Sequence, residues 1–451
     1  MPILTDAKNF IHNEFSNLNL GDKRLNARVL EVAEKMNAGP ALSIPAMTSG
    51  NDSQLKAIYR FFQNERIDDQ AILETHFLNT VERMETYTGK ILLLNDSCFV
   101  TPVKSFEGLL TRGKGKENCV RTHYCLAVSE NGKNLFGILS FHVLSDPIQE
   151  RYPELRNESD IWIRTAQDCL NLIHSRAHAE KLLARCLFVA DREADEFELI
   201  DFLKKNNLGF IIRSQYDRKI IIDGREAKLD EIEIYSKGHG KSYKVNVLAD
   251  KAMKEVEVKR SVLRDIEIIP PIKIAKEFSN IKVNVVMVKD LPGQEDLVEW
   301  RLLTSEVIDN SEQSQFVVES YTHRWKIEEV NKGAKTGVRV EERQFTNLDH
   351  FIPFLAMAFV LAWRIVALRT VVEINPETPI KEGFTKDEVD FLKVQGKKLG
   401  FKMRNLKDAL SLIARLGGFT GRYERPGWQI LWQGWIRFYE RVAGFMLARG
   451  S

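Results

Sequence analysis

The sequence predicts a mixed α/β protein with helical regions at both ends and a mostly β segment within its central region. Three observations predict this fold class: apolar residues at helical spacing near the start, short apolar runs alternating with helical stretches in the middle, and strand-like runs joined by turns over residues 214–303. A chain of 451 residues is too long for one compact core, so roughly two to four structural units are expected. We place them at residues 1–85, 86–372 and 373–451.

Residues 1–85 are predicted to be helical. Behind the turn-like residues 20–22, apolar side chains recur at the spacing of one helix face. They are Leu25, Val29, Val32 and Met36. A second helix is expected near residues 52–64.

The middle of the chain has the order of an α/β domain. Three short apolar runs are predicted strands, at residues 91–94, 124–128 and 135–143. The last two are separated by the hairpin signal Glu-Asn-Gly-Lys at residues 130–133. A helical stretch over residues 161–184 follows, and then a short buried strand over residues 186–190 leads into another helix.

The predicted β insertion contains four strand-like runs, at residues 219–222, 243–247, 256–258 and 283–288. The turns that join them include residues 238–240 and Pro292-Gly293. Helices return over residues 311–372. A linker at Pro376 and Pro379 then leads into a helical segment that is rich in tryptophan.

Composition excludes several classes of protein. With 44% hydrophobic and 28% charged residues the chain is neither disordered nor collagen-like. Its five cysteines are odd in number and include no C-x-x-C pair, so we expect no disulfide framework or zinc site and a reducing compartment. The longest apolar run, residues 351–363, contains Pro353 and is shorter than the roughly 20 residues of a membrane span. We therefore expect a buried core helix, no membrane partner and a cytoplasmic protein without a secretory signal.

Charge alone does not indicate nucleic acid, because the formal net charge is only +2. Residues 381–451, however, carry 14 Lys and Arg against 7 Asp and Glu. Such a basic segment either attracts phosphates or is ordinary solvated surface.

Two aspartates follow predicted strands. Asp96 comes just after residues 91–94, and Asp191 comes directly after residues 187–190. Polar residues past the carboxyl ends of parallel strands line the functional edge of an α/β sheet, so these two carboxylates are expected to meet. The alternatives are a turn residue for Asp96 and a helix N-cap for Asp191.

A third acidic residue shares a predicted helix face with two cations and a phenol. Tyr321, Arg324, Glu328 and Lys335 are spaced 3, 4 and 7 residues apart. On a regular helix these steps keep them within about 60° of arc. The alternative is a solvated face with an i,i+4 pair between Arg324 and Glu328. Three carboxylates from separate elements suit two magnesium ions about 4 Å apart, which promote phosphoryl displacement.

These segments resemble the IS4 family of bacterial transposases. The resemblance covers residues 94–97, 189–195 and 321–329, and with Lys335 the last segment matches the family signature Tyr-x2-Arg-x3-Glu-x6-Lys in full. Further blocks with the same resemblance are residues 20–22, 59–61, 300–306 and 414–419, so it extends over nearly the whole chain.

The resemblance implies an RNase H-like catalytic domain with a β insertion between the second aspartate and the glutamate. It implies that Asp96, Asp191 and Glu328 bind two Mg²⁺ per active site, with Mn²⁺ able to substitute. The same resemblance implies that Tyr321, Arg324 and Lys335 contact phosphates. It implies that Trp300, and more weakly Trp325, stacks on a flipped base, with Arg213 near the DNA. It also implies that Arg28 and Arg60 contact the inverted-repeat end. Without the resemblance, Trp300 is a core tryptophan.

The basic residues Arg112, Lys114, Lys116 and Arg121 either meet a DNA strand or form a solvated loop. The resemblance also implies a homodimer built by the C-terminal helices, in which each subunit cuts the end bound by its partner. The expected activity is cut-and-paste transposition: nicking of transposon ends, hairpin formation, and 3′-OH transfer into target DNA. Three alternatives remain: an RNase H-like nuclease or resolvase without strand transfer, an inactive DNA-binding relative, and a two-carboxylate glycosidase, which leaves Tyr321, Arg324 and Lys335 without a role.

Overall fold

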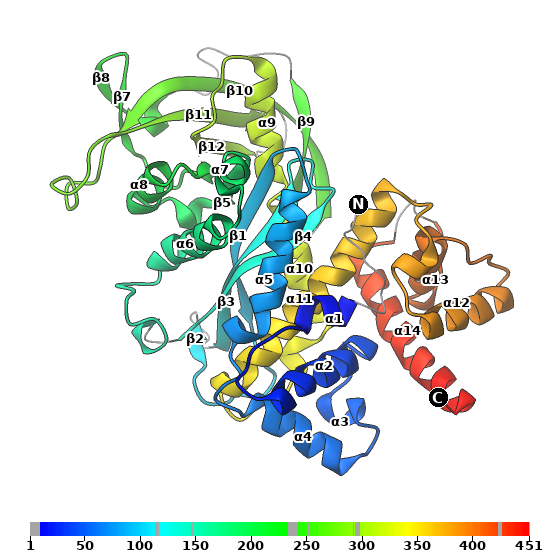
Figure 1. Ribbon diagram of the computed structural model, residues 1–451. Coiled ribbons are helices and arrows are strands. Elements are labelled where there is room, and N and C mark those ends of the chain that lie inside the picture. The colour runs from blue at the N-terminus through cyan, green and yellow to red at the C-terminus, as the bar shows by residue number, and fades with distance from the viewer. Residues whose placement is uncertain are drawn as a thin grey trace.

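The computed structural model describes residues 10–112, 117–145, 148–232, 242–249, 252–291, 293, 298–422 and 426–450. A long mixed sheet runs through the molecule, and helices from both ends of the chain gather beyond one end of it (Figure 1). The predicted fold class, a mixed α/β protein with helical N-terminal and C-terminal regions, is confirmed.

The N-terminal region is helical. Its helices are α1 (Phe10–Phe15), α2 (Lys23–Ala38), α3 (Ile44–Met47), α4 (Asp52–Phe62) and α5 (Asp69–Glu85). Side chains cap their starts, because Asp22, Asn51 and Asp68 each accept a hydrogen bond from a backbone N–H in the first turn. The helices predicted at residues 25–36 and 52–64 are confirmed as α2 and α4.

The first part of the sheet contains β1 (Ile91–Val100), β2 (Leu110–Arg112), β3 (Glu117–Ser129), β4 (Leu135–Leu144), β5 (Cys186–Ala190) and β6 (Gly209–Arg213). Three of these strands are antiparallel neighbours, two more continue in parallel, and the short β2 pairs with the start of β3. The order is β4-β3-β1-β5-β6, with β1 parallel to β5 and β5 parallel to β6. This is the arrangement expected of an RNase H-like core.

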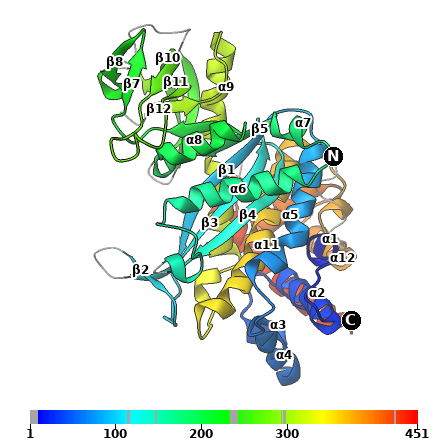
Figure 2. The same ribbon diagram turned by 60° about the vertical axis from the view of Figure 1, so that its left-hand side comes forward.

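Helices cover both faces of this sheet. In Figure 2, α6 (Asp160–His174) and α8 (Phe197–Lys205) lie in front, whereas α5 and α11 (Leu348–Ile374) lie behind. The side chains of β1 alternate accordingly: Leu92 and Leu94 pack in the cluster that contains α11, and Ile91 and Leu93 pack in the cluster that contains α6.

Two further helix predictions concern residues 161–184 and 351–363. The stretch 161–184 was expected as one helix but is two, α6 and the short α7 (Ala179–Leu183). The predicted core helix is confirmed as α11, which is long and apolar enough to cross a membrane but has its most apolar window wholly buried inside the chain. Pro353 lies inside it.

The β insertion extends the central sheet. Its strands are β7 (Lys219–Ile222), β8 (Arg225–Lys228), β9 (Tyr243–Ala249), β10 (Ala252–Ile268), β11 (Ile281–Asp290) and β12 (Glu299–Thr304). Strand β12 pairs antiparallel with β6, and the order continues β12-β11-β10-β7-β8. All four predicted strands are present. The turn at residues 238–240 and Pro292 lie outside the described residues.

The rest of the chain is helical. It contains α9 (Ser311–Thr322), α10 (Trp325–Lys332), a π-helical turn η4 (Gly333–Gly337), and, after α11, α12 (Lys386–Lys398), α13 (Leu406–Leu416) and α14 (Trp428–Arg449). Five 3-10 turns complete the described elements: η1 (Ile148–Glu150), η2 (Arg192–Ala194), η3 (Leu229–Glu231), η5 (Val340–Glu342) and η6 (Ile380–Glu382).

Candidate active site

Two neighbouring parallel strands bring Asp96 and Asp191 to the same edge of the sheet. Asp96 lies in β1, two residues beyond Leu94, the last position that pairs with β5. Asp191 directly follows Ala190, the last residue of β5. Sequence reasoning placed Asp96 after its strand, whereas the structure places it inside, because β1 stays paired with β3 as far as Val100. The expected functional edge is formed where β5 has ended and β1 continues.

Asp191 also caps a turn. Its Oδ1 accepts the N–H of Glu193 at 2.9 Å, at the start of η2. The N-cap alternative is therefore correct for one carboxylate oxygen of Asp191. Capping orients the side chain and does not by itself occupy the second oxygen.

Glu328 is brought to this edge by α10, and Arg324 connects it to Asp96. Arg324 Nη1 lies 2.9 Å from Asp96 Oδ2, and Arg324 Nη2 lies 3.2 Å from Glu328 Oε1. The three side chains are partly open to solvent, with 17% of Asp96, 20% of Arg324 and 29% of Glu328 exposed. One guanidinium thus holds carboxylates from a strand and a helix that are far apart in sequence. The i,i+4 pair between Arg324 and Glu328, which was the alternative interpretation, is present. Arg324 also pairs with Asp96.

The charges of this cluster are unbalanced. Burial raises the pKa of Asp96 to about 7; Arg324 opposes this rise, and the nearby Asp191 and Glu328 add to it. Burial also acts to lower the pKa of Arg324, but Asp96, together with Tyr321, Asp191 and Glu328, raises it overall, so the guanidinium stays charged. Because Asp191 contributes to both effects, it lies within electrostatic reach of the pair.

Tyr124 joins the strand of Asp96 to the helix of Glu328. It lies opposite Asp96 in the β1–β3 register. Its buried hydroxyl lies 3.0 Å from the carbonyl oxygen of Ile327 and 2.7 Å from Asn331 Oδ1, and it can donate to either. Sequence reasoning did not single out Tyr124. The available signal was a phenol within an otherwise apolar strand, since a buried hydroxyl requires a partner.

The prediction that Tyr321, Arg324, Glu328 and Lys335 share the face of one regular helix is wrong. The backbone stays in the αR region through His323 and Arg324, but its hydrogen bonds shorten to i,i+3, as from Arg324 N–H to the Tyr321 carbonyl. Helix α9 therefore ends before Arg324, and α10 passes into the π-helical turn that carries Lys335. Local hydrogen-bond geometry of this kind is invisible to a 3.6-residue repeat.

Three predicted DNA contacts lie around the triad. Tyr321, in the last turn of α9, is buried against Trp300 with ring centroids 5.0 Å apart at 65°, and burial raises the pKa of its phenol although Arg324 and Arg213 lower it. Trp300 is only 7% exposed, so the core alternative describes its position in this DNA-free structure. Lys335 Nζ lies 3.8 Å from Glu341 Oε1.

The other predicted contacts are more widely spread. Arg28 on α2 pairs with Glu31 at 2.5 Å, and Arg60 on α4 is exposed. Trp325 begins α10, where Lys326 Nζ lies 4.6 Å from its ring centroid. Arg213 ends β6 and donates to the Glu299 carbonyl.

The predicted basic loop is only partly described. Lys114 and Lys116 lie outside the described residues, and Arg112 ends β2. Arg121 is in β3, which corrects its assignment to a loop. Its guanidinium lies 3.3 Å from Ser97 Oγ and 3.6 Å from a carboxylate oxygen of Glu193, so it borders the segments that carry Asp96 and Asp191.

Asp195 is a second residue that sequence reasoning missed. It ends the Asp-Arg-Glu-Ala-Asp string, is fully buried, and pairs with Arg218 at 2.6 Å. It also accepts hydrogen bonds from the backbone N–H groups of Gln215 and Tyr216. Asp195 therefore orders the loop that leads from β6 into the insertion.

Two protein-family models match parts of this chain. Residues 7–67 match the family model of a transposase DNA-binding domain, and residues 156–363 match the model of a transposase DDE domain. The DDE match contains Asp191 and Glu328 and begins after Asp96. The chain therefore contains a transposase DNA-binding domain and a transposase DDE domain on an RNase H-like core. These two domains support a transposase, an enzyme that cleaves DNA and joins its strands with divalent metal ions.

The three carboxylates suit such ions chemically, because magnesium and related cations prefer hard oxygen ligands. Across the part of the chain that the structure describes, no three Asp, Glu, His or Cys side chains converge closely enough to hold an ion as they stand. The guanidinium of Arg324 takes a cation's place between Asp96 and Glu328. The donor set fits, and Arg324 is its counterion in this state.

Proposed function

We propose that this chain is a cut-and-paste transposase of the IS4 family, most similar to the Tn5 transposase. Its catalytic triad is Asp96, Asp191 and Glu328. One observation carries the proposal: a single guanidinium gathers Asp96 from a strand and Glu328 from a helix beside the strand end that bears Asp191. The enzyme nicks the transposon end, forms a hairpin through the free 3′-OH, reopens it, and joins the 3′ ends to target DNA.

Asp96, Asp191 and Glu328 would hold two Mg²⁺, for which Mn²⁺ would substitute. When bound, such a pair activates the attacking oxygen and stabilises the leaving oxygen of an in-line displacement. Arg324 lies at the rim of the triad with its charge retained, so it can contact a phosphate once its carboxylate partners are neutralised. Tyr321 and Lys335 flank the same edge and share this role.

DNA-end recognition belongs to the N-terminal region. The match to a transposase DNA-binding domain contains Arg28 and Arg60, whose side chains meet the inverted repeat. Trp300, or more weakly Trp325, stacks on a base that is flipped out during hairpin formation, and Arg213 lies near that strand. For this role Trp300 must leave its contact with Tyr321.

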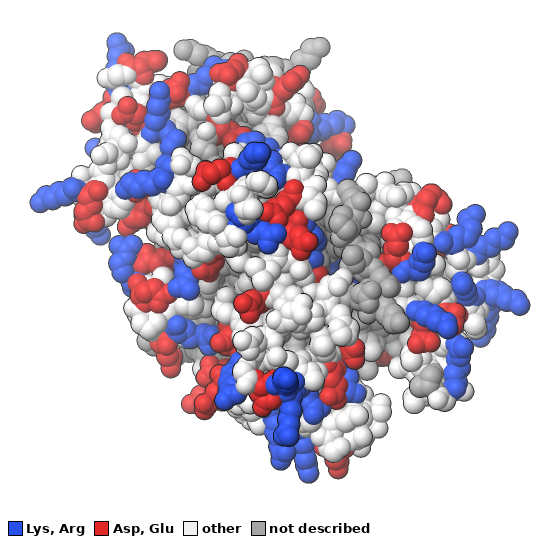
Figure 3. Space-filling model, viewed as in Figure 1, with Lys and Arg blue, Asp and Glu red and all other residues white. Residues whose placement is uncertain are grey.

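Assembly is proposed for the C-terminal helices. Lys and Arg side chains gather on α12 and α13, at the right of Figure 3, where the sequence has its basic excess. We propose domain boundaries near residues 85 and 372, a homodimer formed through residues 373–451, and target DNA near these basic helices. The protein acts in the bacterial cytoplasm, at the nucleoid when bound to DNA.

The test uses candidate inverted-repeat DNA with Mg²⁺ and a denaturing gel that resolves nicks, hairpins and joined products. Asp96→Ala, Asp191→Ala and Glu328→Ala are each expected to abolish nicking while end binding stays measurable. Glu312→Ala, an exposed acidic residue on α9, is the matched control and should nick normally. Nicking retained in any one of the three triad variants contradicts the assignment.

Two further measurements separate the alternatives. Precut ends incubated with target DNA yield joined products for a transposase and none for a nuclease or resolvase. Trp300→Ala should impair hairpin formation more than first-strand nicking. Equal loss of both steps argues against the flipping role of Trp300.

A further inference from the structure

The C-terminal helix α14 contacts the catalytic segment directly, through Trp432. A Cβ added at Gly337 would lie 2.2 Å from Trp432 Cε3 and 2.3 Å from Cζ3, and one at Gly333 would lie 2.9 Å from Cζ2. Neither glycine has a positive φ. Close approach of the indole, and not backbone conformation, is therefore what these two positions require.

These glycines bound the turn that carries Lys335. The turn η4 is π-helical, with the Val338 N–H bonded to the Gly333 carbonyl at 2.9 Å. A π-turn widens the helix and changes the direction of the residues that follow. Trp432 packs against this widened turn, so its ring helps to determine where Lys335 lies relative to the helix of Glu328.

Trp428 makes a second contact with the same helix. Its ring stacks on Trp432 at 5.5 Å and 19°, and its Nε1–H donates to Oε1 of Glu329, the neighbour of Glu328. Arg369 of α11 lies on the ring of Trp428, 4.0 Å from its centroid. Helix α10 is therefore held by α14 next to the catalytic glutamate as well as at the turn beyond it.

Trp432 acts on the π-turn through the shape of its side chain. Its side chain is fully buried, and among the described residues its Nε1 has no hydrogen-bond partner. A buried N–H without a partner destabilises the fold, so the contact stabilises through packing alone. Trp435, one turn further along α14, packs instead against Phe384 and Phe438 of the C-terminal region.

We propose that Trp432, assisted by Trp428, is a positioning residue for the active site: the C-terminal helix sets the placement of Glu328 and Lys335 through the π-turn. This inference rests on the proposed catalytic role of Glu328 and phosphate-binding role of Lys335. It makes the C-terminal region part of the catalytic geometry in addition to any role in assembly.

The experiment is a size-exchange cycle in the full-length chain. Gly337→Ala inserts a methyl group where the indole lies, and Trp432→Leu removes the indole atoms that it meets. Gly337→Ala is expected to lower the nicking rate at saturating end DNA by about 100-fold, as misplacement of reacting groups does, with end-binding affinity unchanged. The double variant should regain most of that rate, because the leucine leaves room for the methyl group.

The matched control is Trp435→Leu, which removes a similarly buried tryptophan one turn further along α14, where its ring packs against Phe384 and Phe438. Its nicking rate per folded molecule should equal that of the wild type, whereas that of Trp432→Leu should be lower. Folded fractions are measured by circular dichroism. If Gly337→Ala does not fold, the comparison of Trp432→Leu with Trp435→Leu decides the question.

The outcomes separate the two proposals. Equal rates for Trp432→Leu and Trp435→Leu, or no recovery in the double variant, overturn the positioning role. Glu328→Ala in the wild-type background tests the triad itself: retained nicking there rejects the proposed function, whatever the result of the cycle. Loss of nicking in Glu328→Ala without recovery in the double variant rejects only the coupling through α14.

Discussion

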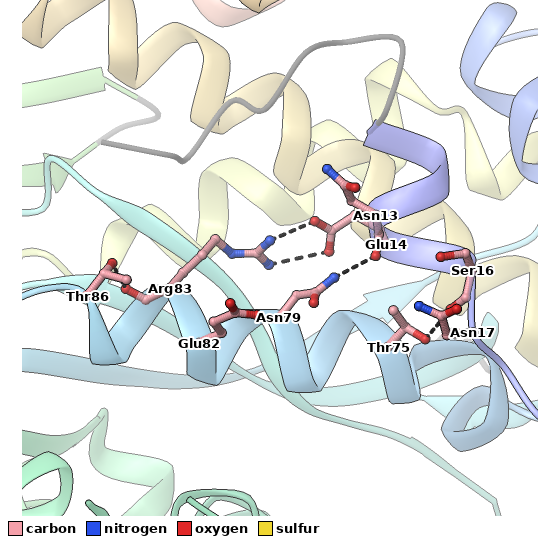
Figure 4. A pocket seen from close by; sticks show the side chains of 9 residues that line it. All are labelled: Asn13, Glu14, Ser16, Asn17, Thr75, Asn79, Glu82, Arg83 and Thr86. Carbon is pink, nitrogen blue, oxygen red and sulfur yellow. Dashed lines mark hydrogen bonds and ion pairs between the residues drawn. The ribbon is translucent and has the colours of Figure 1, made fainter. Parts of the chain in front are cut away.

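An arginine pairs with carboxylates both in the N-terminal helices and beside the end of β5, and these two clusters differ in charge balance. In the first, the anchor cluster of Glu14, His76 and Arg83, Glu14 of α1 meets Arg83 of α5 at 2.7 Å, beside a pocket between the two helices (Figure 4). In the second, the proposed active site, Arg324 is shared by Asp96 and Glu328. The difference lies in how many carboxylates each arginine serves and how open they are to solvent.

The anchor cluster is balanced and closed. Burial would raise the pKa of Glu14, but Arg83 lowers it overall, and only 4% of the glutamate side chain is exposed. The ring of His76 is neutral, since burial lowers its pKa and its Nε2 accepts the Ile138 N–H, so its Nδ1–H donates to Glu14. One cation meets one carboxylate, and every partner is hydrogen-bonded. Such a cluster holds α1 against the core.

The active site is acid-rich and partly open. One guanidinium serves two carboxylates, a third lies nearby, and the pKa of Asp96 is raised to about 7. A group perturbed in this way by burial and by like charges is typical of a functional site. An excess of partly exposed carboxylates, rather than the ion pair itself, therefore distinguishes the proposed cation-binding site from the structural contact.

Among the four variants that test this contrast between the clusters, the largest effect is expected for Arg324→Ala. Removal of the guanidinium frees Asp96 and Glu328, so the DNA-free protein should bind Mn²⁺ more tightly in calorimetry. Nicking at saturating metal should nevertheless fall by about 1000-fold, the scale on which a transition-state arginine acts in phosphoryl transfer. An unchanged Mn²⁺ affinity would mean that Arg324 is not the counterion of this site. It would contradict the proposed difference in charge balance between the two clusters.

Glu14→Gln tests the balanced cluster. The change leaves Arg83 without its anion, and the free energy of unfolding at pH 7 should drop by about 3 kcal/mol in urea titrations. Because the folded pKa of Glu14 lies below its ordinary value of 4.5, the stability that the carboxylate adds is present above pH 4.5 and is lost as the pH falls toward the folded pKa. The difference between variant and wild type should therefore shrink below pH 4.5. A difference independent of pH would refute the ion-pair account, and nicking per folded molecule should not change.

Tyr124→Phe tests the hydrogen bond that joins the strands of the proposed active site to helix α10. Loss of the hydroxyl removes one hydrogen bond and should lower the free energy of unfolding by about 1 kcal/mol. Nicking, measured where both proteins are fully folded, should also fall, because the hydroxyl holds the helix of Glu328. Tyr152→Phe is the control, since its hydroxyl accepts the N–H of Val143 in β4 instead of bonding to α10. Equal nicking in both variants would show that Tyr124 only stabilises the fold.

The smallest effect is expected for Glu31→Gln, which removes an exposed partner of Arg28. About a third of each side chain is exposed, so stability should change by less than about 0.5 kcal/mol. Affinity for end DNA should rise at low salt and converge with the wild type at high salt, because a competing anion beside Arg28 is gone. Glu34→Gln removes the same charge from another exposed position on α2. A larger rise in Glu34→Gln would exclude a specific role of Arg28.

Much of the candidate site could be predicted because its signals are local. Short apolar runs and turn residues predict the bounds of β5 and the hairpin between β3 and β4. The predicted end of β5 in turn places Asp191 at the edge of the sheet. The convergence of Asp96 with Glu328 was implied by the resemblance to the IS4 family, because the spacing alone left a solvated pair of Arg324 and Glu328 as the alternative. The break before Arg324 and the burial of Trp300 could not be predicted, because they depend on contacts between distant segments.

By itself, the sequence determined the order of helices and strands, the α/β class and the identity of the acidic and basic residues at the sheet edge. Apolar periodicity and turn chemistry act between near neighbours, so they can be read without a fold. Only the tertiary structure decided that β1 continues past Asp96 along β3, that Arg324 lies between two carboxylates, and that Trp432 packs against Gly337. Those outcomes depend on strand pairing, shared charge and close packing between segments far apart in the chain, which no local spacing encodes.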